Sequence, residues 1–227
     1  MSTLRYDILT IFPDMFGSYI GASMIKRGIA KKLISIYIHD VRDFGVGPHR
    51  KVDERPYGGG PGMVLQVGPI VKMMATLKAK PKETLVALFS AGGELFTAER
   101  ARAFSKKYTR IVMIAGHYEG VDERVARILR SCGFAVAELS IGPYVLTGGE
   151  LPSMVVMDAV SRHIPGFLGK QESREEERYG PGLPSYSRPE IFMYKKRVFR
   201  VPKVLLSGDH AKIDAWRAAS QKPKAVS

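Results

Sequence analysis

The sequence contains a single cysteine, Cys132, among its 227 residues. No internal disulfide can therefore form, and a cysteine-based zinc site is not suggested. Apolar runs are short, and none approaches the roughly 18 residues that would indicate a membrane span. The first residues lack a basic region followed by an apolar core, so we expect no secretion signal, a cytoplasmic location and no membrane partner.

The motifs of several common enzyme chemistries are also absent. The five histidines are scattered without ligand spacing on one predicted helix, so we assign no residue to a metal site. No serine or cysteine lies in a nucleophile-elbow pattern. Residues 58–62 are rich in glycine but lack the Lys-Ser/Thr that completes a P-loop, and no Rossmann glycine pattern follows the first predicted strand. These absences disfavour metal-dependent hydrolysis, serine or cysteine nucleophiles and P-loop enzymes.

Acidic residues are scarce relative to basic ones. The chain has 35 Lys and Arg against 22 Asp and Glu, which gives a net charge of +13. A surplus of this size favours a polyanion partner, with nucleic acid first, because phosphate contacts release counterions. The alternative is a solvated basic surface without a partner. A membrane surface is disfavoured, since no strongly basic helix with a bulky apolar face is present.

Apolar, β-prone segments alternate with helical patterns along most of the chain. The predicted strands cover residues 4–12, 34–38, 85–89, 110–115 and 134–139. The predicted helices cover residues 14–32, with Asp14 as the N-cap, then 67–78, a helix opened by Thr97, 122–132 and 149–164. Alternation of this kind indicates βαβ units, so we predict an α/β fold with a mainly parallel sheet.

Three successive predicted strands each end in a glycine-bearing turn. The turns are residues 90–93, 116–120 and 140–149. The carboxyl ends of parallel strands meet at one edge of a sheet, where open α/β sheets bind their ligands. We therefore predict that the three turns converge and wrap a small cofactor with their backbone. The alternative is a set of tight turns that only join strands to helices.

The remaining segments are rich in charged residues and lack the apolar pattern of a protein core. Residues 42–62 form a long irregular stretch in which basic residues and Tyr57 suit RNA contact, although a plain surface loop is the alternative. Residues 170–189 have the composition of a mobile linker. The strongly basic end contains a predicted helix, 210–221, capped by Asp209. We predict three regions: a cofactor-binding domain over 1–168, a linker over 169–188 and a small helical carboxyl-terminal domain over 189–227.

Four motifs in this chain resemble those of one enzyme family. They run over residues 53–63 (DERPYGGGPGM), 116–125 (GHYEGVDERV), 140–152 (SIGPYVLTGGELP) and 206–208 (LSG). In this order they are similar to the bacterial tRNA (guanine-37-N1)-methyltransferases, the TrmD family of the SPOUT superfamily. The resemblance covers nearly the whole chain.

The resemblance implies features that residue patterns do not predict. It implies a SPOUT-type sheet with a deep trefoil knot, although threaded chains are otherwise nearly absent from protein folds. It implies S-adenosylmethionine as the cofactor, bound by the knotted loops, and leaves a magnesium requirement open. It also implies tRNA as a partner and a homodimer whose active sites are each formed by both subunits. The carboxyl-terminal domain would help to clamp the tRNA.

The resemblance also assigns site residues, position by position. The implied catalytic residues are Glu177 as the base that removes the N1 proton and Arg162 as the cation that stabilises the guanine O6. The implied cofactor-binding residues are Phe89, Ser90, Gly92, Gly116, Tyr118, Glu119, Gly120, Ser140, Ile141, Gly142, Pro143, Tyr144, Val145, Leu146, Gly148 and Gly149. From the residues alone, other roles stay open: a solvated acid for Glu177, an ion pair with Asp158 for Arg162, and core packing for the tyrosines.

The chain departs from the family pattern at several of these positions. Glu177-Arg178-Tyr179 stands where the family has Asp-Ser-Phe, Pro143 replaces an Asp, and Ala91-Gly92 replaces Pro-Gln. A carboxylate moved by one methylene can lower the rate about 10²-fold, so Glu175 or Glu176 is an alternative base. A non-catalytic RNA-binding homologue is the alternative function, and a ribose 2′-OH methyltransferase is a second alternative.

Overall fold

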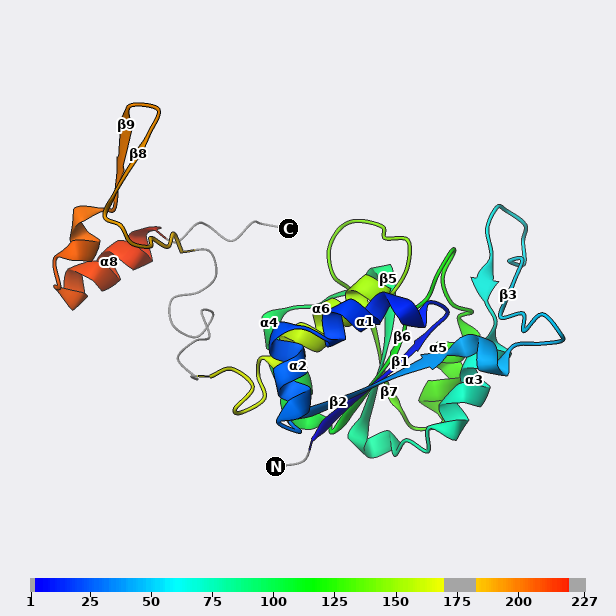
Figure 1. The fold of residues 1–227 in the computed structure, drawn as a ribbon. Coiled ribbons are helices and arrows are strands. Elements are labelled where there is room, and N and C mark those ends of the chain that lie inside the picture. Colours follow the sequence, from blue (N-terminus) through cyan, green and yellow to red (C-terminus); the bar gives the residue numbers. More distant parts are fainter. Residues whose placement is uncertain (1–2, 170–182, 221–227) are drawn as a thin grey trace. The chain divides into compact units, whose positions relative to one another are not determined.

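The computed structural model describes residues 3–169 and 183–220. The chain divides into two compact units, residues 1–168 and 169–227. No helix in these described ranges is long and apolar enough to cross a membrane. Each unit is described separately below (Figure 1).

The first unit is built on a five-stranded sheet in which every neighbouring pair is parallel. The strand order is β2-β1-β6-β5-β7. The strands are β1 (Leu4–Thr10), β2 (Ile34–Asp40), β5 (Thr84–Leu95), β6 (Arg110–Ile114) and β7 (Ala135–Ser140). The predicted strands and the mainly parallel sheet are therefore confirmed.

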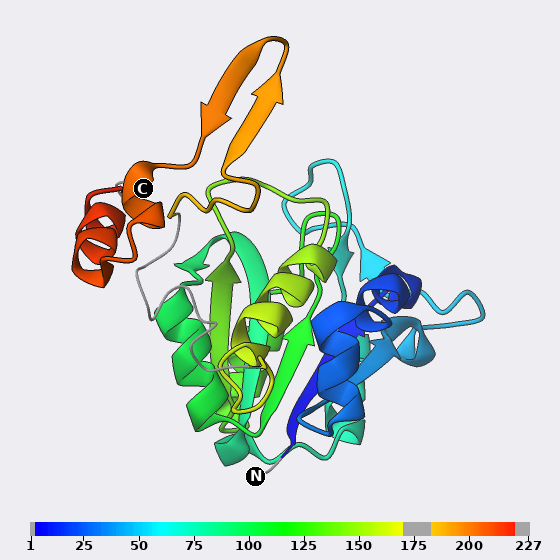
Figure 2. The same ribbon diagram turned by 60° about the vertical axis from the view of Figure 1, so that its left-hand side comes forward.

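Helices cover both faces of this sheet. One face carries α1 (Gly17–Ile20), α2 (Ser23–Ala30), α4 (Ala98–Lys107) and α6 (Glu150–Ser161), and the other carries α3 (Val67–Thr76) and α5 (Arg124–Ser131). Figure 2 shows α6 lying across the middle of its face, with α4 on one side and α2 on the other.

Successive side chains of each strand point to opposite faces of the sheet, and this alternation divides the apolar residues between two cores. In β6, Ile111 and Met113 pack beneath α6, whereas Val112 and Ile114 pack beneath α3 and α5. Successive side chains of a strand point to opposite faces, so a strand buried on both sides must be apolar at nearly every position. This requirement explains why the strand segments read as continuous apolar runs in the sequence.

The prediction of one helix over residues 14–32 is wrong. That segment contains a 3₁₀ helix (Pro13–Phe16), then α1 and α2, and the Asp14 side chain caps none of them. Gly21 ends α1, and Ser23 takes a φ of 47°, a left-handed conformation that no helix interior contains. Thr97, by contrast, caps α4 as predicted, because its hydroxyl accepts the Arg100 N–H.

The irregular stretch before α3 contains only short elements. They are a 3₁₀ helix (Val41–Phe44) and the two-residue strands β3 (Asp53–Glu54) and β4 (Val64–Leu65), which pair with each other. A further 3₁₀ turn (Pro81–Glu83) leads into β5. Tyr57, at the tip between β3 and β4, is 99% exposed.

The second unit is not purely helical, which corrects that prediction. It contains an antiparallel hairpin of β8 (Ile191–Tyr194) and β9 (Arg197–Arg200), a 3₁₀ turn (Lys203–Leu206) and α8 (His210–Ser220). The cap of α8 follows the prediction, since the Asp209 carboxylate accepts the Lys212 N–H at 3.2 Å. The hairpin has no Asn-Gly or Gly-Gly turn, so its residues carry no recognisable hairpin signal.

Candidate active site

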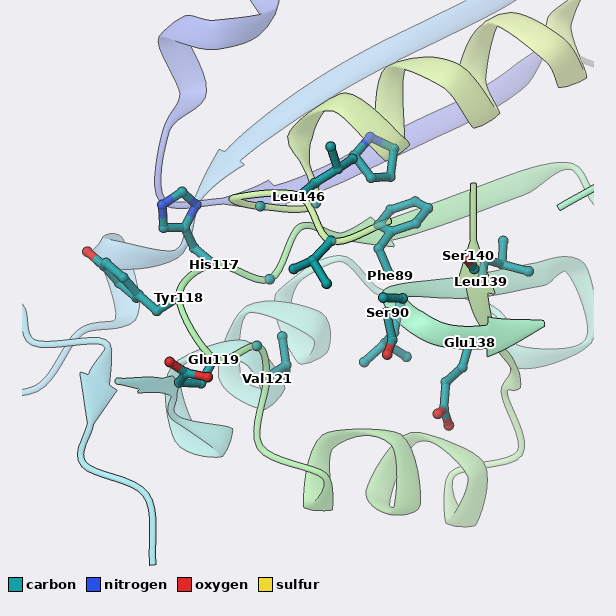
Figure 3. Close-up of a pocket in the computed structure, with 18 of the residues that line it drawn as sticks. Phe89, Ser90, His117, Tyr118, Glu119, Val121, Glu138, Leu139, Ser140 and Leu146 are labelled. Carbon is teal, nitrogen blue, oxygen red and sulfur yellow. The ribbon is translucent and has the colours of Figure 1, made fainter. Parts of the chain in front are cut away.

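A pocket of about 360 Å³ opens at the carboxyl ends of β5, β6 and β7. Its lining comes from the three turns predicted to converge, together with the first turns of α5 and α6. Figure 3 shows Phe89 and Ser90 of β5 beside the end of β7, with Leu146 across from them and His117, Tyr118 and Glu119 to one side. The predicted convergence of the turns is confirmed.

The turn after Phe89 is a bulge within β5. Pairing of β5 with β7 shifts register between Phe89 and Glu94, so the intervening residues bow out at the pocket. A Cβ at Gly93 would lie 2.8 Å from the backbone oxygen of Glu138. Glycine at position 93 therefore lets β5 return to β7 after the bulge.

The second turn presents Tyr118 and Glu119 to the pocket mouth. Tyr118 has a φ of 58°, which is uncommon for a non-glycine residue. The Glu119 N–H donates to the Met63 backbone oxygen at 3.0 Å, so the glycine-rich loop before β4 supports this turn. A Cβ on Gly62 would lie 2.3 Å from a Glu119 carboxylate oxygen, so Gly62 leaves the room that the Glu119 side chain occupies.

The third turn is a series of tight local hydrogen bonds. The Ser140 hydroxyl donates to the Gly142 backbone oxygen at 2.9 Å, and the Tyr144 N–H donates to that same oxygen at 2.9 Å. Tyr144 folds back so that its hydroxyl reaches the Ile141 oxygen at 3.2 Å, and its ring fills the space where a Gly142 side chain would stand. Beyond this fold Val145 is 85% exposed.

The third turn then closes against the second. The Gly149 N–H donates to the Gly116 backbone oxygen at 2.7 Å, and Gly148 forms a β-bridge with His117. A Cβ at Gly149 would lie 2.7 Å from the Ala115 Cα, which is backbone and cannot move aside. Close backbone approach is thus the reason for glycine at position 149.

A buried carboxylate lies under the pocket floor. Glu150, the first residue of α6, is 1% exposed and accepts the Thr10 hydroxyl at 2.7 Å. Its other oxygen is 3.7 Å from Nδ1 of His117, a pocket residue that also stacks edge-on against Phe12 and Tyr118. A side chain on Gly148 would clash with both Glu150 and His117. The floor therefore fixes the position of the His117 ring.

Acidic side chains surround the pocket although the chain as a whole is basic. They are Glu119, Asp122, Glu123 and Glu138. Asp122 is bound by the Arg124 guanidinium, whose hydrogen bonds lower the pKa of that carboxyl below its usual range. Glu138 pairs with Arg130 at 2.6 Å, whereas the Glu119 carboxylate has no hydrogen bond or ion pair within the described ranges. Such a rim favours a ligand that carries positive charge.

The predicted cofactor residues nearly all line this pocket. The exceptions are Gly92, Gly142 and Pro143, which lie next to lining residues but are not part of the lining. Sequence reasoning missed His117, Asp122, Glu123 and Glu138. The first three lie inside the motif at residues 116–125, and the residue pattern indicates only a helix start for the acids at 122 and 123. Nothing in a strand sequence distinguishes Glu138 from any other exposed acid.

Of the two predicted catalytic residues, only Arg162 belongs to the described part of the chain, and it does not line the pocket. Glu177 lies outside the described residues, as do Glu175 and Glu176. Arg162 is half-buried at the carboxyl end of α6. The pocket lies at the other end of this 12-residue helix, so roughly 18 Å separate the two at about 1.5 Å per residue. The Asp158 carboxylate, the alternative ion-pair partner considered for Arg162, accepts the Tyr19 hydroxyl.

Comparison with known proteins identifies relatives along the whole length of the chain. Residues 4–227 match the family model described as tRNA (Guanine-1)-methyltransferase TrmD. A protein of Thermomicrobium roseum named tRNA (guanine-N(1)-)-methyltransferase is 47% identical over 218 residues, covering 94% of this chain and 77% of the relative. Proteins of the same name from Dehalococcoides mccartyi and Dictyoglomus turgidum are each 45% identical, covering 94% of this chain and 84% and 83% of the relatives.

Proposed function

The chain belongs to the tRNA (Guanine-1)-methyltransferase TrmD family, and we propose that it methylates N1 of guanine 37 in tRNA with S-adenosylmethionine as the donor. The observation that carries this proposal is the pocket at the ends of β5, β6 and β7. It combines closely packed glycine loops with an acidic rim in a protein whose net charge is +13.

The residues of the pocket fit this cofactor. A pocket of about 360 Å³ lies within the usual range for small-molecule sites. Phe89, Ile141 and Leu146 offer apolar walls for a nucleobase, and the three loops offer backbone N–H and C=O groups. When bound, S-adenosylmethionine supplies a methyl group on a positively charged sulfur. The Glu119 carboxylate, which has no ion pair within the described ranges, suits that charge and would repel a phosphate ligand.

In this reaction the protein's side chains must remove one proton from the guanine and stabilise the negative charge that develops on it. The N1–H of guanine is a weak acid, and a carboxylate within hydrogen-bond reach removes its proton as N1 acquires the methyl group. We assign this role to Glu177 by family resemblance. As the proton leaves, negative charge develops on O6, and the guanidinium of Arg162 stabilises it. The guanine must leave its stack to reach the pocket.

We further propose that the active site is shared between two subunits. The position of Arg162 supports this, because a residue roughly 18 Å along α6 from the pocket is poorly placed to serve the pocket of its own chain. In a symmetric dimer, the same surface patch is used twice, so each pocket would receive Arg162 from the partner subunit.

The trefoil knot of the family is part of the same proposal. It rests on the family match, and the return of Gly149 to the Gly116 oxygen after residues 140–148 is consistent with it. A cytoplasmic location and a magnesium requirement stay predictions. In the described part of the chain, no three His, Cys, Asp or Glu side chains are grouped as metal ligands would be.

Methyl transfer to tRNA tests the function directly. Labelled S-adenosylmethionine is incubated with an unmodified tRNA transcript carrying G37, beside a copy carrying A37. We expect label only on the first, recovered as N1-methylguanine, and about a 10²-fold or greater loss in the Glu177→Gln variant. Loss of activity in Glu175→Gln or Glu176→Gln instead would move the base to that residue.

Two results would contradict this assignment. Label recovered on a ribose 2′-OH would make the protein a different methyltransferase. No label on either RNA, from protein that binds both S-adenosylmethionine and tRNA, would leave a non-catalytic RNA-binding homologue.

A further inference from the structure

The β8–β9 hairpin is exposed on both of its faces. All eight residues of its two strands are exposed, and both views show it projecting away from α8 (Figure 1, Figure 2). A two-stranded hairpin is at best marginally stable on its own, and bare apolar side chains add a risk of aggregation. Exposed apolar residues on such an element indicate a surface that is covered when the protein acts.

The pairing register of β8 and β9 places different kinds of side chain on the two faces of the hairpin. Phe192 pairs with Phe199 and Tyr194 with Arg197, so one face carries three aromatic rings and a guanidinium. We call this set the aromatic face. The other face pairs Ile191 with Arg200 and Met193 with Val198, so it is aliphatic apart from Arg200. The rings of Phe192, Tyr194 and Phe199 are each more than half exposed.

The tip of the hairpin holds two lysines in a backbone conformation that disfavours them. Lys195 and Lys196 have φ values of 47° and 62°, the sign required at both positions of a type I′ turn. Asn-Gly is the preferred pair there, and a left-handed residue with a side chain costs roughly 1 kcal/mol. The Lys195 ammonium also lies 5.4 Å from the centre of the Tyr194 ring. Two lysines retained in this turn despite the conformational strain indicate that their positive charge has a function.

Among the described residues, no acid forms an ion pair with this element, although Glu190 immediately precedes it. Between residues 191 and 208 the sequence has five basic residues and no acidic one. Aromatic rings next to arginine and lysine form the combination that binds single-stranded nucleic acid, where rings stack on bases and cations contact phosphates. A protein partner for an apolar hairpin would need no such concentration of positive charge.

We propose that the aromatic face of the β8–β9 hairpin is a stacking platform for an unpaired nucleobase of tRNA, with the lysine tip on the adjacent phosphates. This proposal deepens the function above and depends on tRNA being the substrate. It assigns Phe192 and Phe199 to base stacking and Lys195 and Lys196 to charge neutralisation. It makes the hairpin a determinant of tRNA affinity and not of cofactor binding.

Fluorescence reads the stacking directly. Trp216 is the only tryptophan, so a Trp216→Phe background carrying Phe192→Trp reports from the aromatic face alone. We expect an unmodified tRNA transcript with G37 to quench this tryptophan. The matched control, Met193→Trp in the same background, reports from the aliphatic face and should respond much less. Equal quenching of both probes, or of neither, would overturn the proposal.

Affinity measurements with the full-length protein separate stacking from charge. Phe192→Leu with Phe199→Leu keeps both positions apolar but removes the rings, and we expect tRNA affinity to fall about 10-fold or more. Met193→Leu with Val198→Ile makes the same number of changes on the aliphatic face and should leave affinity unchanged. Lys195→Asn with Lys196→Gly should relieve the turn and flatten the plot of log affinity against log salt by about 1.4 to 1.8.

The outcomes distinguish this proposal from the proposed function. Unchanged tRNA affinity in the leucine variant, while the wild type methylates G37, would refute the platform and leave the function standing. A change of oligomeric state in that variant, with RNA affinity unchanged, would make the face a protein interface instead. Quenching at position 192 from a protein that methylates no tRNA would support the platform and refute the function.

Discussion

Single glycines set the shape of the pocket, because two of its loops touch where no side chain fits. Gly149 has an ordinary φ of −84°, so its requirement is steric alone. Gly148 faces Glu150 and His117, and Gly62 faces Glu119. The sequence predicts that such glycines lie in turns, but it does not predict which segment of the chain each one contacts.

Gly149→Ala should separate the β6 turn from the start of α6. The added methyl group would meet the Ala115 backbone at 2.7 Å, so we expect a loss of about 1–3 kcal/mol in the free energy of unfolding. Affinity for S-adenosylmethionine, measured by calorimetry, should fall at least about 10-fold. The control is Gly68→Ala, an open position in α3, which should stabilise the protein by up to about 1 kcal/mol. Unaltered cofactor affinity in Gly149→Ala would contradict this view of the pocket.

Residue identity alone could not reveal the charge arrangement at the site. Glu150 is a first-turn acid, which in most helices is exposed and favours the helix dipole. Here it is buried against Thr10, which lies 140 positions earlier in the chain. Long-range placement of this kind depends on the fold, so motif spacing predicted the loops but missed the acids and the histidine that complete the site.

Secondary-structure elements were predictable where periodicity was strong. The five strands of the sheet follow apolar runs, and five of the six predicted helices occur close to their expected positions. The errors occur where the turn signal was weak: the break at Gly21 and Ser23, and the hairpin turn made of two lysines. Residue propensities do not predict that a lysine will adopt a left-handed φ, because non-glycine residues rarely do so.

One buried carboxylate ties three strands together. Asp7 of β1 is fully buried and accepts hydrogen bonds from His39 of β2, from Arg110 of β6 and from Arg5. Burial alone would raise the pKa of Asp7, but these hydrogen bonds outweigh it and hold the pKa well below the usual range. The folded state therefore binds fewer protons than the unfolded state as the carboxyl titrates. The resulting stabilisation is present above about pH 4 and is lost as the pH falls further.

Asp7→Asn should remove this pH-dependent stabilisation. Arg110 would remain mostly buried without its counter-charge, so we expect a loss of about 3 kcal/mol near pH 7. The difference from wild type should shrink as the pH falls below about 4. Urea unfolding between pH 3 and pH 7 measures both effects, with exposed Asp14→Asn as the control. A constant difference across that range would show that Asp7 acts by shape and not by charge.

At the scale of the whole molecule, the proposal of a shared active site requires two chains. The pocket and Arg162 lie at opposite ends of α6, and the resemblance to the family implies a homodimer. This arrangement can be tested by complementation, because each subunit of a mixed dimer can carry a different defect.

Arg162→Ala and Leu146→Arg should each be nearly inactive, the second because it places a large cation in the pocket. If each site uses both subunits, co-expression of the two variants should restore about a quarter of wild-type activity. Half of the dimers would then be mixed, and each mixed dimer would have one intact site. If both residues served the same chain, the mixture would stay inactive. Mixing each variant with itself is the control.

The contacts of β1 also determine when the protein can fold during its synthesis. β1 leaves the ribosome well before α6, yet Tyr6 bonds to Ser161 and Thr10 to Glu150, and Tyr6 and Ile8 pack in the core that α6 completes. At bacterial elongation rates of about 5–20 residues per second, the nascent chain carries this apolar strand without its cover for roughly 10–30 s. Throughout that interval its exposed apolar side chains are available to chaperones and proteases. Variants that weaken the docking of α6 should therefore reduce the yield of folded protein in cells more than the activity of each molecule that folds.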